Sequence, residues 1–425
     1  MQHASPLDVL RNNRNFRRLF LARLVSLFGD WFNTLAVLAL LREMDGLSAS
    51  AFGWVLILKT LPAIVAAPAA GVLADRVSRR SILIGADALR SLVVAAMLGL
   101  MLYPSVGLLY LLVVIQSAVG VFFEPARNAL LPDIVSPEEL TSANVLGAAA
   151  WSTMLALGSA AGGLLTATAG WEAALVVDAG TYLLSMVLVM GIQEPHWERT
   201  TSRGGGLMRW LGLTDIAHGV SYLLKRPRVL SLTLVKSGWT LAGGITLVLT
   251  TLGERVYPLA GEAILGVTVL YVARGLGTGT GPFLARWISG SKPEAMEKLI
   301  GAAYLCGGVF YLGVSNTTSL WTAAVMVALA HLGGATAWVF SSVRLQQLVP
   351  TAVRGRVFAA EAAGFTGMMA LSTWTYGQLI DEDVASLSTL TACLGISLLF
   401  PAAAWWLRGL RLGWAGEAAD AESAL

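Results

Sequence analysis

The chain has 425 residues, of which 56% are hydrophobic and only 13% are charged. A soluble domain carries about 25% charged residues, so the composition excludes an ordinary water-soluble globular protein. The net charge of +3 is too small to indicate a nucleic-acid-binding protein, and the two cysteines, Cys306 and Cys393, suit neither a zinc site nor a disulfide framework.

Apolar segments recur along the whole chain, and each is long enough to cross a hydrocarbon core of about 30 Å as a helix. Turn and charge clusters divide them, and abundant Gly and Ala favour close helix packing in lipid. The sequence therefore predicts an all-α membrane protein with twelve transmembrane helices. The predicted helices cover residues 16–41, 52–73, 81–103, 106–126, 140–168, 172–192, 229–253, 262–285, 297–315, 319–343, 356–380 and 384–407.

Basic residues gather in every second loop and at both ends of the chain. The opposite loops hold only Arg42 and Arg255, each beside an acid, and the last of them is purely acidic, from Asp381 to Asp383. Cytoplasmic loops carry the excess of Lys and Arg. The pattern predicts a multi-pass protein of a bacterial-type inner membrane with both termini in the cytoplasm.

The longest hydrophilic stretch divides the chain into two halves of six helices. Each half carries a similar run before its third helix, beginning at Gly71 and at Gly281, and a similar Leu-Pro or Val-Pro pair after its fourth. Duplicated halves with a binding site between them are typical of secondary transporters. We expect an N-terminal bundle over 1–192, a cytoplasmic linker over 193–228, and a C-terminal bundle with a short tail over 229–425.

The loop after the second helix resembles the signature of the major facilitator superfamily, Gly-x-Leu-Ala-Asp-Arg-x-Gly-Arg-Arg, with Ser78 in place of the second glycine. The resemblance implies two pseudo-symmetric six-helix bundles, a cavity lined by helices 1, 4, 7 and 10, and a cluster that latches the outward-open state. The latch candidates are Gly71, Asp75, Arg76, Arg79, Arg80 and Arg127.

Further motifs resemble the efflux subfamily that contains enterobactin exporters, macrolide efflux proteins and lysophospholipid transporters. They include Gly29-Asp30 in the first helix, the run from Phe122 to Arg127, Asp178 in the sixth helix, and the run from Gly355 to Phe358. Substrates vary within that subfamily, so the resemblance does not name one.

Two glycine-rich runs have a structural interpretation as well as a functional one. The run from Gly158 to Gly163 resembles part of the antiporter motif of drug exporters, and the run from Gly275 to Gly281 superficially resembles a nucleotide-binding loop. Both lie inside apolar helices with no preceding strand. We expect them to be helix-packing faces.

Charged residues inside apolar helices cost about 2.5 kcal/mol or more each near the bilayer centre, so they usually face a cavity or a partner. Asp30 lies near the expected midplane and is either a structural acid paired with Lys59 or Arg23, or a proton-coupling group. Glu361 and Glu124 are further proton-coupling candidates. The substrate-binding candidates are Asp30, Lys59, Lys236, Arg274 and His331.

The cations among these candidates have two interpretations. Lys236 and Arg274 either pair with acids and carbonyls or form a cationic pocket for an anionic substrate group. Packing in the core is the simpler role for His331. Asp87 and Arg90 are spaced i, i+3 on one helix, and we expect them to neutralise each other.

The sequence favours a secondary transporter, a proton-coupled exporter of an amphipathic small molecule that acts by alternating access. The alternatives are a lysophospholipid flippase or importer without proton coupling, and a non-transporting receptor or assembly subunit built on a transporter scaffold. We expect no enzyme activity, catalytic residues, cofactor, metal or nucleic-acid partner. The expected partners are a small or lipid-like substrate, protons and the bilayer, with the chain acting as a monomer.

Overall fold

The computed structural model describes residues 6–46, 48–193, 220–290 and 292–414. It divides into two compact units, Met1–Leu211 and Gly212–Leu425. Within the described ranges the structure is helical, and the only β contact there is an isolated bridge between Leu259 and Glu262. The all-α prediction is confirmed.

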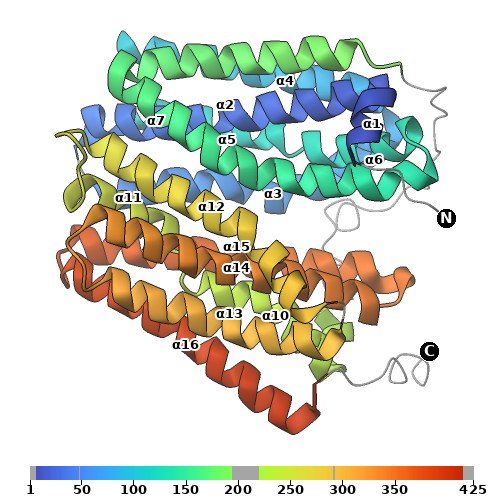
Figure 1. Ribbon diagram of the computed structural model, residues 1–425. Coiled ribbons are helices and arrows are strands. Elements are labelled where there is room, and N and C mark those ends of the chain that lie inside the picture. Colours follow the sequence, from blue (N-terminus) through green and yellow to red (C-terminus); the bar gives the residue numbers. More distant parts are fainter. Residues whose placement is uncertain (1–5, 47, 194–219, 291, 415–425) are drawn as a thin grey trace. The chain divides into compact units, whose positions relative to one another are not determined.

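The first unit contains the blue to green helices of Figure 1, and most of them run alongside one another. Its elements are α1 (Pro6–Asn12), α2 (Arg14–Asp45), α3 (Ala49–Arg76), α4 (Arg79–Met97), the short helix η1 (Leu98–Met101), α5 (Val106–Gly120), α6 (Phe123–Ile134) and α7 (Pro137–Met190).

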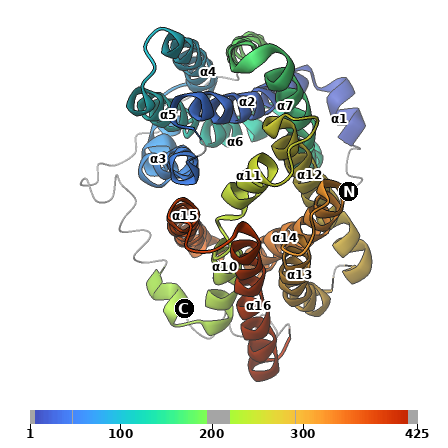
Figure 2. The ribbon, with the colours of Figure 1, turned by 90° about the vertical axis from the view of Figure 1, so that its left-hand side faces the viewer.

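The second unit contains the yellow-green to red helices of Figures 1 and 2. Its elements are α10 (Pro227–Thr240), α11 (Ile245–Arg255), α12 (Ala263–Ser289), α13 (Pro293–Val314), α14 (Leu320–Leu348), α15 (Thr351–Asp381) and α16 (Leu387–Leu412).

Local sequence sets the helix ends. Asn13 precedes α2, and its Oδ1 accepts a hydrogen bond from the Phe16 amide at 2.9 Å, while Ser105 caps α5 in the same way. These side chains satisfy amides that have no partner inside the helix. Gly170 divides α7, since its φ of 85° and ψ of 167° are not helical. The predicted fifth and sixth helices meet at this turn.

Nine helical stretches within the described ranges are long and apolar enough to cross a membrane, by length and composition. One of them, Ala149–Met190, contains the turn at Gly170 and is 42 residues long. A shorter apolar helix lies at Ala49–Pro62. The count of twelve spans stays a prediction.

Glycines let the helices approach closely. In α12, a Cβ at Gly277 would fall on the carbonyl of Ala328 in α14, and one at Gly281 would fall on the carbonyl of Leu332. In α7, a Cβ at Gly162 would lie 3.1 Å from the Cα of Phe32 in α2. Both glycine-rich runs therefore form packing faces, as expected.

Within the first unit, α2 packs along α7, and α4 packs on α7 as well. Figure 2 views these helices nearly end on. Asp30 of α2, Arg90 of α4 and Tyr182 of α7 are thereby brought together, although they are far apart in the sequence. Of the charged candidates of the N-terminal half, this arrangement places Asp30 in the cluster.

Candidate functional site

Arg90 of α4 is the centre of a polar cluster in the first unit. Its Nη2 donates to Oδ1 of Asp30 in α2 at 2.6 Å and to the hydroxyl of Tyr182 in α7 at 2.7 Å. The Tyr182 hydroxyl donates to the same Asp30 oxygen at 2.5 Å. The Arg90 guanidinium also lies 4.1 Å from the centre of the Tyr182 ring. Asp30 is thus held by a charge-assisted network that joins three helices.

The pairing differs from the sequence-based expectations. Asp30 pairs with Arg90, and not with Lys59 or Arg23, so the expected partners were wrong. The expected ion pair between Asp87 and Arg90 is present, but it is longer than the pair between Asp30 and Arg90. The Asp87 Oδ1 lies 3.9 Å from Arg90 Nη1, while its Oδ2 accepts from the Ser185 hydroxyl of α7 at 2.5 Å. Spacing along one helix could not reveal partners on two others.

Lys59 of α3 has neutral neighbours. Its Nζ donates to Asn33 Oδ1 at 3.1 Å and to Thr34 Oγ1 at 2.9 Å, both in α2. No carboxylate among the described residues lies within ion-pair distance of Lys59, although Asp30 and Asp178 are in electrostatic range. Lys59 therefore contributes a partly buried positive charge next to the Asp30 network and forms no direct ion pair with the described residues.

Asp178 of α7 is the acid that the sequence analysis assigned to a motif but not to the site. Its side chain is fully buried, and neither carboxyl oxygen has a hydrogen-bond partner at bonding geometry among the described residues. The amide of Asn33 lies close to this carboxyl, but its Nδ2 is directed at Met97 Sδ, 3.8 Å away. A Cβ at Gly29 would lie 2.6 Å from Asp178 Oδ1. The three motif residues Gly29, Asp30 and Asp178 are thus neighbours.

In the second unit, Lys236 of α10 and Glu361 of α15 form a buried ion pair. The Lys236 Nζ lies 2.9 Å from Glu361 Oε2, and the two side chains are 7% and 2% exposed. The ring centres of Trp338 and Phe358 lie 4.9 Å and 5.9 Å from the Lys236 nitrogen. Two separate candidates, one for substrate binding and one for proton coupling, therefore form a single pair.

Among the described residues, Arg274 of α12 has fewer hydrogen-bond and ion-pair partners than Lys236. Its Nη1 donates to Thr246 Oγ1 at 2.8 Å, and its Nε is buried without a hydrogen-bond partner. No carboxylate of the described residues forms an ion pair with it. His331 of α14 lies in electrostatic range of Arg274 and is 2.9 Å from the hydroxyl of Tyr311.

Glu124 and Arg127, two further candidates of the first unit, contact each other. Glu124 Oε1 lies 3.1 Å from Arg23 Nε, and its Oε2 lies 3.0 Å from Arg127. Arg23 also donates to the carbonyl of Gly147 at 2.7 Å. The Glu124 side chain is 45% exposed. Glu124 therefore neutralises two arginines, and Arg127 pairs within its own helix, α6.

The latch candidates are described in part. Arg79 pairs with Asp133 of α6 and donates to the Ala129 carbonyl at 3.0 Å. Arg80 donates to the carbonyls of Val189 and Met190 at the end of α7. Both arginines thus join the start of α4 to neighbouring helix ends. The side chains of Gly71, Asp75 and Arg76 lie outside the described part of the chain.

Sequence reasoning missed a comparable cluster in the second unit. Glu297 of α13 is 1% exposed. Its Oε1 accepts from Arg344 of α14 at 2.9 Å and 3.1 Å, and its Oε2 accepts from Arg408 of α16 at 2.6 Å. The spacing of these residues, 47 and 111 positions apart, leaves no local signal, and only their occurrence at loop ends could have suggested a contact.

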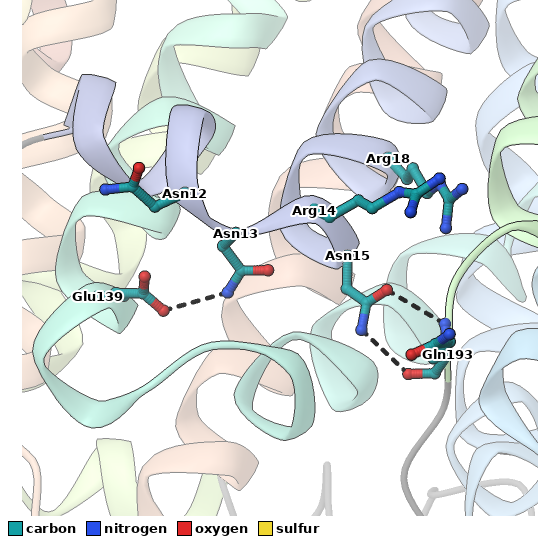
Figure 3. Close-up of a pocket in the computed structure, with 7 residues that line it drawn as sticks. All are labelled: Asn12, Asn13, Arg14, Asn15, Arg18, Glu139 and Gln193. Atoms are coloured by element: carbon teal, nitrogen blue, oxygen red, sulfur yellow. Dashed lines mark hydrogen bonds between the residues drawn. The ribbon is translucent and has the colours of Figure 1, made fainter.

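A polar pocket of about 330 Å³ lies in the first unit where α1 meets α2 and the ends of α7. Figure 3 shows two contacts across it: Asn13 Nδ2 donates to Glu139 at 3.1 Å, and Asn15 exchanges two 3.2 Å hydrogen bonds with the backbone of Gln193. These contacts hold the helix ends together, so we interpret the pocket as part of the packing of these ends and not as a ligand-binding site. Among the described residues, no three His, Cys, Asp or Glu side chains gather as metal ligands would.

Comparison with known proteins gives the chain a family. The model of the Major Facilitator Superfamily matches residues 19–373. The putative bacilysin exporter BacE of Bacillus subtilis is 33% identical over 33% of this chain and 34% of its own length. Macrolide efflux protein A of Streptococcus pyogenes is 26% identical over 52% of this chain and 54% of its own length. The match thus spans about half or less of these two relatives.

A solved structure shows the same fold. The bacterial homologue of the human lysosomal transporter Spinster, in an inward-facing and unoccupied conformation, superposes with a TM-score of 0.70 and 16% sequence identity. The superposition covers 96% of this chain and 99% of that one.

Proposed function

Because the chain belongs to the major facilitator superfamily, we propose that it is a proton-driven exporter of an amphipathic small molecule that acts by alternating access. The observation that carries the proposal is a set of buried and partly buried charges within apolar helices of both units, around Arg90 in the first and around Lys236 and Arg274 in the second. Charges at such depth are costly and mark substrate or proton pathways in transporters. The efflux names of two relatives support the direction of transport.

The second unit supports an anionic or zwitterionic substrate. Lys236 is neutralised by Glu361 at 2.9 Å. Among the described residues, Arg274 has only the hydroxyl of Thr246 as a hydrogen-bond acceptor, and its buried Nε has no partner there. An unpaired guanidinium in an apolar bundle gains most from an anion that brings two oxygens. Arg274 is therefore the stronger candidate of the two cations for a carboxylate or phosphate group of the substrate.

The substrate assignment is tested with Arg274→Ala and the charge-preserving control Arg274→Lys. In purified protein, we expect the alanine variant to lose at least tenfold in affinity for an anionic lysophospholipid and to keep its affinity for an uncharged amphipath of similar size. The lysine variant should keep part of the preference. Equal losses for both ligands would contradict a role in anion recognition.

The direction and the driving force are tested in everted membrane vesicles of an expressing bacterium. Respiration acidifies their interior, so an exporter should accumulate its substrate inside and lose it when an uncoupler is added. If the uncoupler does not reduce uptake, the result would favour the alternative, a lysophospholipid flippase without proton coupling. A protein that binds these compounds but never moves them would favour a receptor.

The membrane setting follows from the same proposal. Both termini and the linker over 193–228 lie in the cytoplasm of a bacterial-type inner membrane, on the side of the excess Lys and Arg. The functional unit is a monomer of two bundles, 1–192 and 229–425. The latch at Gly71, Asp75 and Arg76 controls the conformational balance together with Arg79 and Arg80, which contact neighbouring helix ends.

A further inference from the structure

The polar cluster of the first unit contains more acids than bases. Among the described residues, three carboxyl groups, on Asp30, Asp87 and Asp178, are in electrostatic range of Arg90, and two of them, Asp30 and Asp178, are also in range of Lys59. If every group were ionised, the cluster would bear one uncompensated negative charge in an apolar bundle. Such a charge is expensive to bury, so one of the three acids is the natural place for a proton.

Hydrogen-bond donors distinguish the three acids. Asp30 accepts from Arg90 and from Tyr182, which stabilises its ionised form. Asp87 accepts from Ser185 at 2.5 Å and lies 3.9 Å from the Arg90 guanidinium. Asp178 is fully buried, receives no hydrogen bond at bonding geometry, and forms no ion pair with the described residues. Its surroundings favour the neutral acid more than those of the other two.

Access separates Asp30 from the other two acids. The Asp30 side chain is 37% exposed, while Asp87 and Asp178 are both 0% exposed. Asp30 and Asp178 are connected through α2, because Gly29 contacts the Asp178 carboxyl and precedes Asp30 in the chain. Any side chain at position 29 would overlap Thr181 Oγ1 and crowd Asp178 Oδ1. The glycine thus lets α7 place an acid directly against the helix that carries the exposed one.

We propose that Asp178, and not Asp30, carries the transported proton, while Asp30 serves as the fixed counter-ion of Arg90. The inference rests on the proposed proton-driven export. On the outer side, a hydronium ion gives up a proton: one of its O–H bonds breaks, an O–H bond forms on an Asp178 oxygen, and neutral water is left. In the inward-facing state the Asp178 O–H bond breaks, and a water molecule on the cytoplasmic side takes the proton and becomes hydronium.

The charged neighbours define how the proton is released. Loss of the proton leaves an anion within reach of Lys59 on α3 and Arg90 on α4, with Asn33 on α2 between the Lys59 ammonium and Asp178. The new anion competes with Asp30 for these two cations. Deprotonation of Asp178 therefore weakens the bonds that join α2, α4 and α7, which links proton release to a rearrangement of the bundle.

Infrared spectroscopy tests the protonation state without transport. Purified protein in detergent at pH 7 should show the carbonyl stretch of a protonated, dry carboxyl group that exchanges slowly in heavy water. Asp178→Asn, which has nearly the shape of the neutral acid, should remove this band and leave the apparent melting temperature within about 2 °C of wild type. Asp30→Asn and Asp87→Asn are the matched controls and should retain the band. Loss of the band in either control but not in Asp178→Asn would overturn the assignment.

Transport separates failure of the inference from failure of the proposed function. In proteoliposomes, Asp178→Asn should lose accumulation driven by an imposed pH gradient at least tenfold and keep substrate exchange at zero gradient. If wild type itself shows no response to the gradient, the proposed function fails. If wild type responds and Asp178→Asn responds equally, the export proposal stands and the assignment to Asp178 is wrong.

Discussion

The ion pair between Lys236 and Glu361 can be used to measure how much stability the second unit loses when a buried charge has no partner. Replacing Glu361 with leucine would leave the Lys236 ammonium 7% exposed and without its carboxylate at 2.9 Å. Removing one partner of a buried ion pair costs about 3–5 kcal/mol. The Trp338 ring, 4.9 Å from the ammonium, offsets roughly 0.5–2 kcal/mol through a cation–π contact. The expected loss is therefore about 3 kcal/mol, at the low end of the range for a lost buried partner.

The double variant supplies the matched control. Lys236→Met with Glu361→Leu removes both charges and keeps similar side-chain volumes. A buried pair replaced by apolar residues is often neutral or more stable, so the double variant should recover the stability that the single variant loses. Recovery would show that the damage in Glu361→Leu comes from the isolated cation and not from altered packing.

Thermal unfolding in detergent, followed by tryptophan fluorescence, measures both variants. A loss of about 3 kcal/mol corresponds to roughly 6–12 °C in melting temperature for a unit of about 200 residues. The single variant should fall by that amount, and the double variant should lie within about 3 °C of wild type. A single variant as stable as wild type, or a double variant as unstable as the single one, would refute the reasoning.

The remaining predictions concern packing, topology and the latch. Gly277→Ala should destabilise the second unit by about 1–3 kcal/mol, because its Cβ would fall on the Ala328 carbonyl, whereas Gly85→Ala, with open space around its Cβ, should be neutral in the same unfolding assay. A cysteine at Ser202 should react with a membrane-impermeant maleimide in everted vesicles, and labelling in intact cells would contradict the topology. Asp75→Asn should slow transport in vesicles at least tenfold while the protein stays folded in detergent; wild-type turnover would remove the case for a latch.

The sequence predicted the helices well because their signals are local. Length, apolarity and turn residues such as Gly46 and Asn13 determine where a helix begins and ends, and the structure places its breaks near those residues. The glycine run from Gly275 to Gly281 was also interpretable, since small residues in an apolar helix have few roles other than close packing. The predicted seventh helix over 229–253 lies within one candidate span, Pro227–Arg255. The prediction missed a break inside it, where α10 ends at Thr240 and α11 begins at Ile245.

The charge partners could not be predicted, because they depend on how helices rotate against one another. Asp30 and Arg90 are 60 positions apart, and nothing in either segment specifies that their side chains face each other. The i, i+3 rule suggested Asp87 for Arg90, yet Asp30 lies closer to the guanidinium and Ser185 binds the Asp87 carboxyl. Spacing along the sequence identifies neighbours within a single helix. A buried charge is stabilised by partners on adjacent helices, and spacing does not reveal those partners.

Asp178 shows the limit most clearly. The sequence identified Asp178 only as part of a motif. The structure adds that its carboxyl oxygens lie beside Gly29 and have no hydrogen-bond donor among the described residues. A missing hydrogen bond has no sequence signature. The pairing of Lys236 with Glu361 has the same character, since it combined two residues that had been assigned to different roles.

The central claim is that a proton gradient drives export, and transport in everted vesicles tests it most directly. Vesicles with and without the protein are energised by respiration and offered a macrolide, a lysophospholipid and a catecholate siderophore, one at a time, with and without an uncoupler. The account predicts that at least one compound accumulates only in vesicles that contain the protein and leaves again when the pH gradient collapses. Accumulation that persists after the gradient collapses, or no protein-dependent accumulation of any of the three, would contradict it.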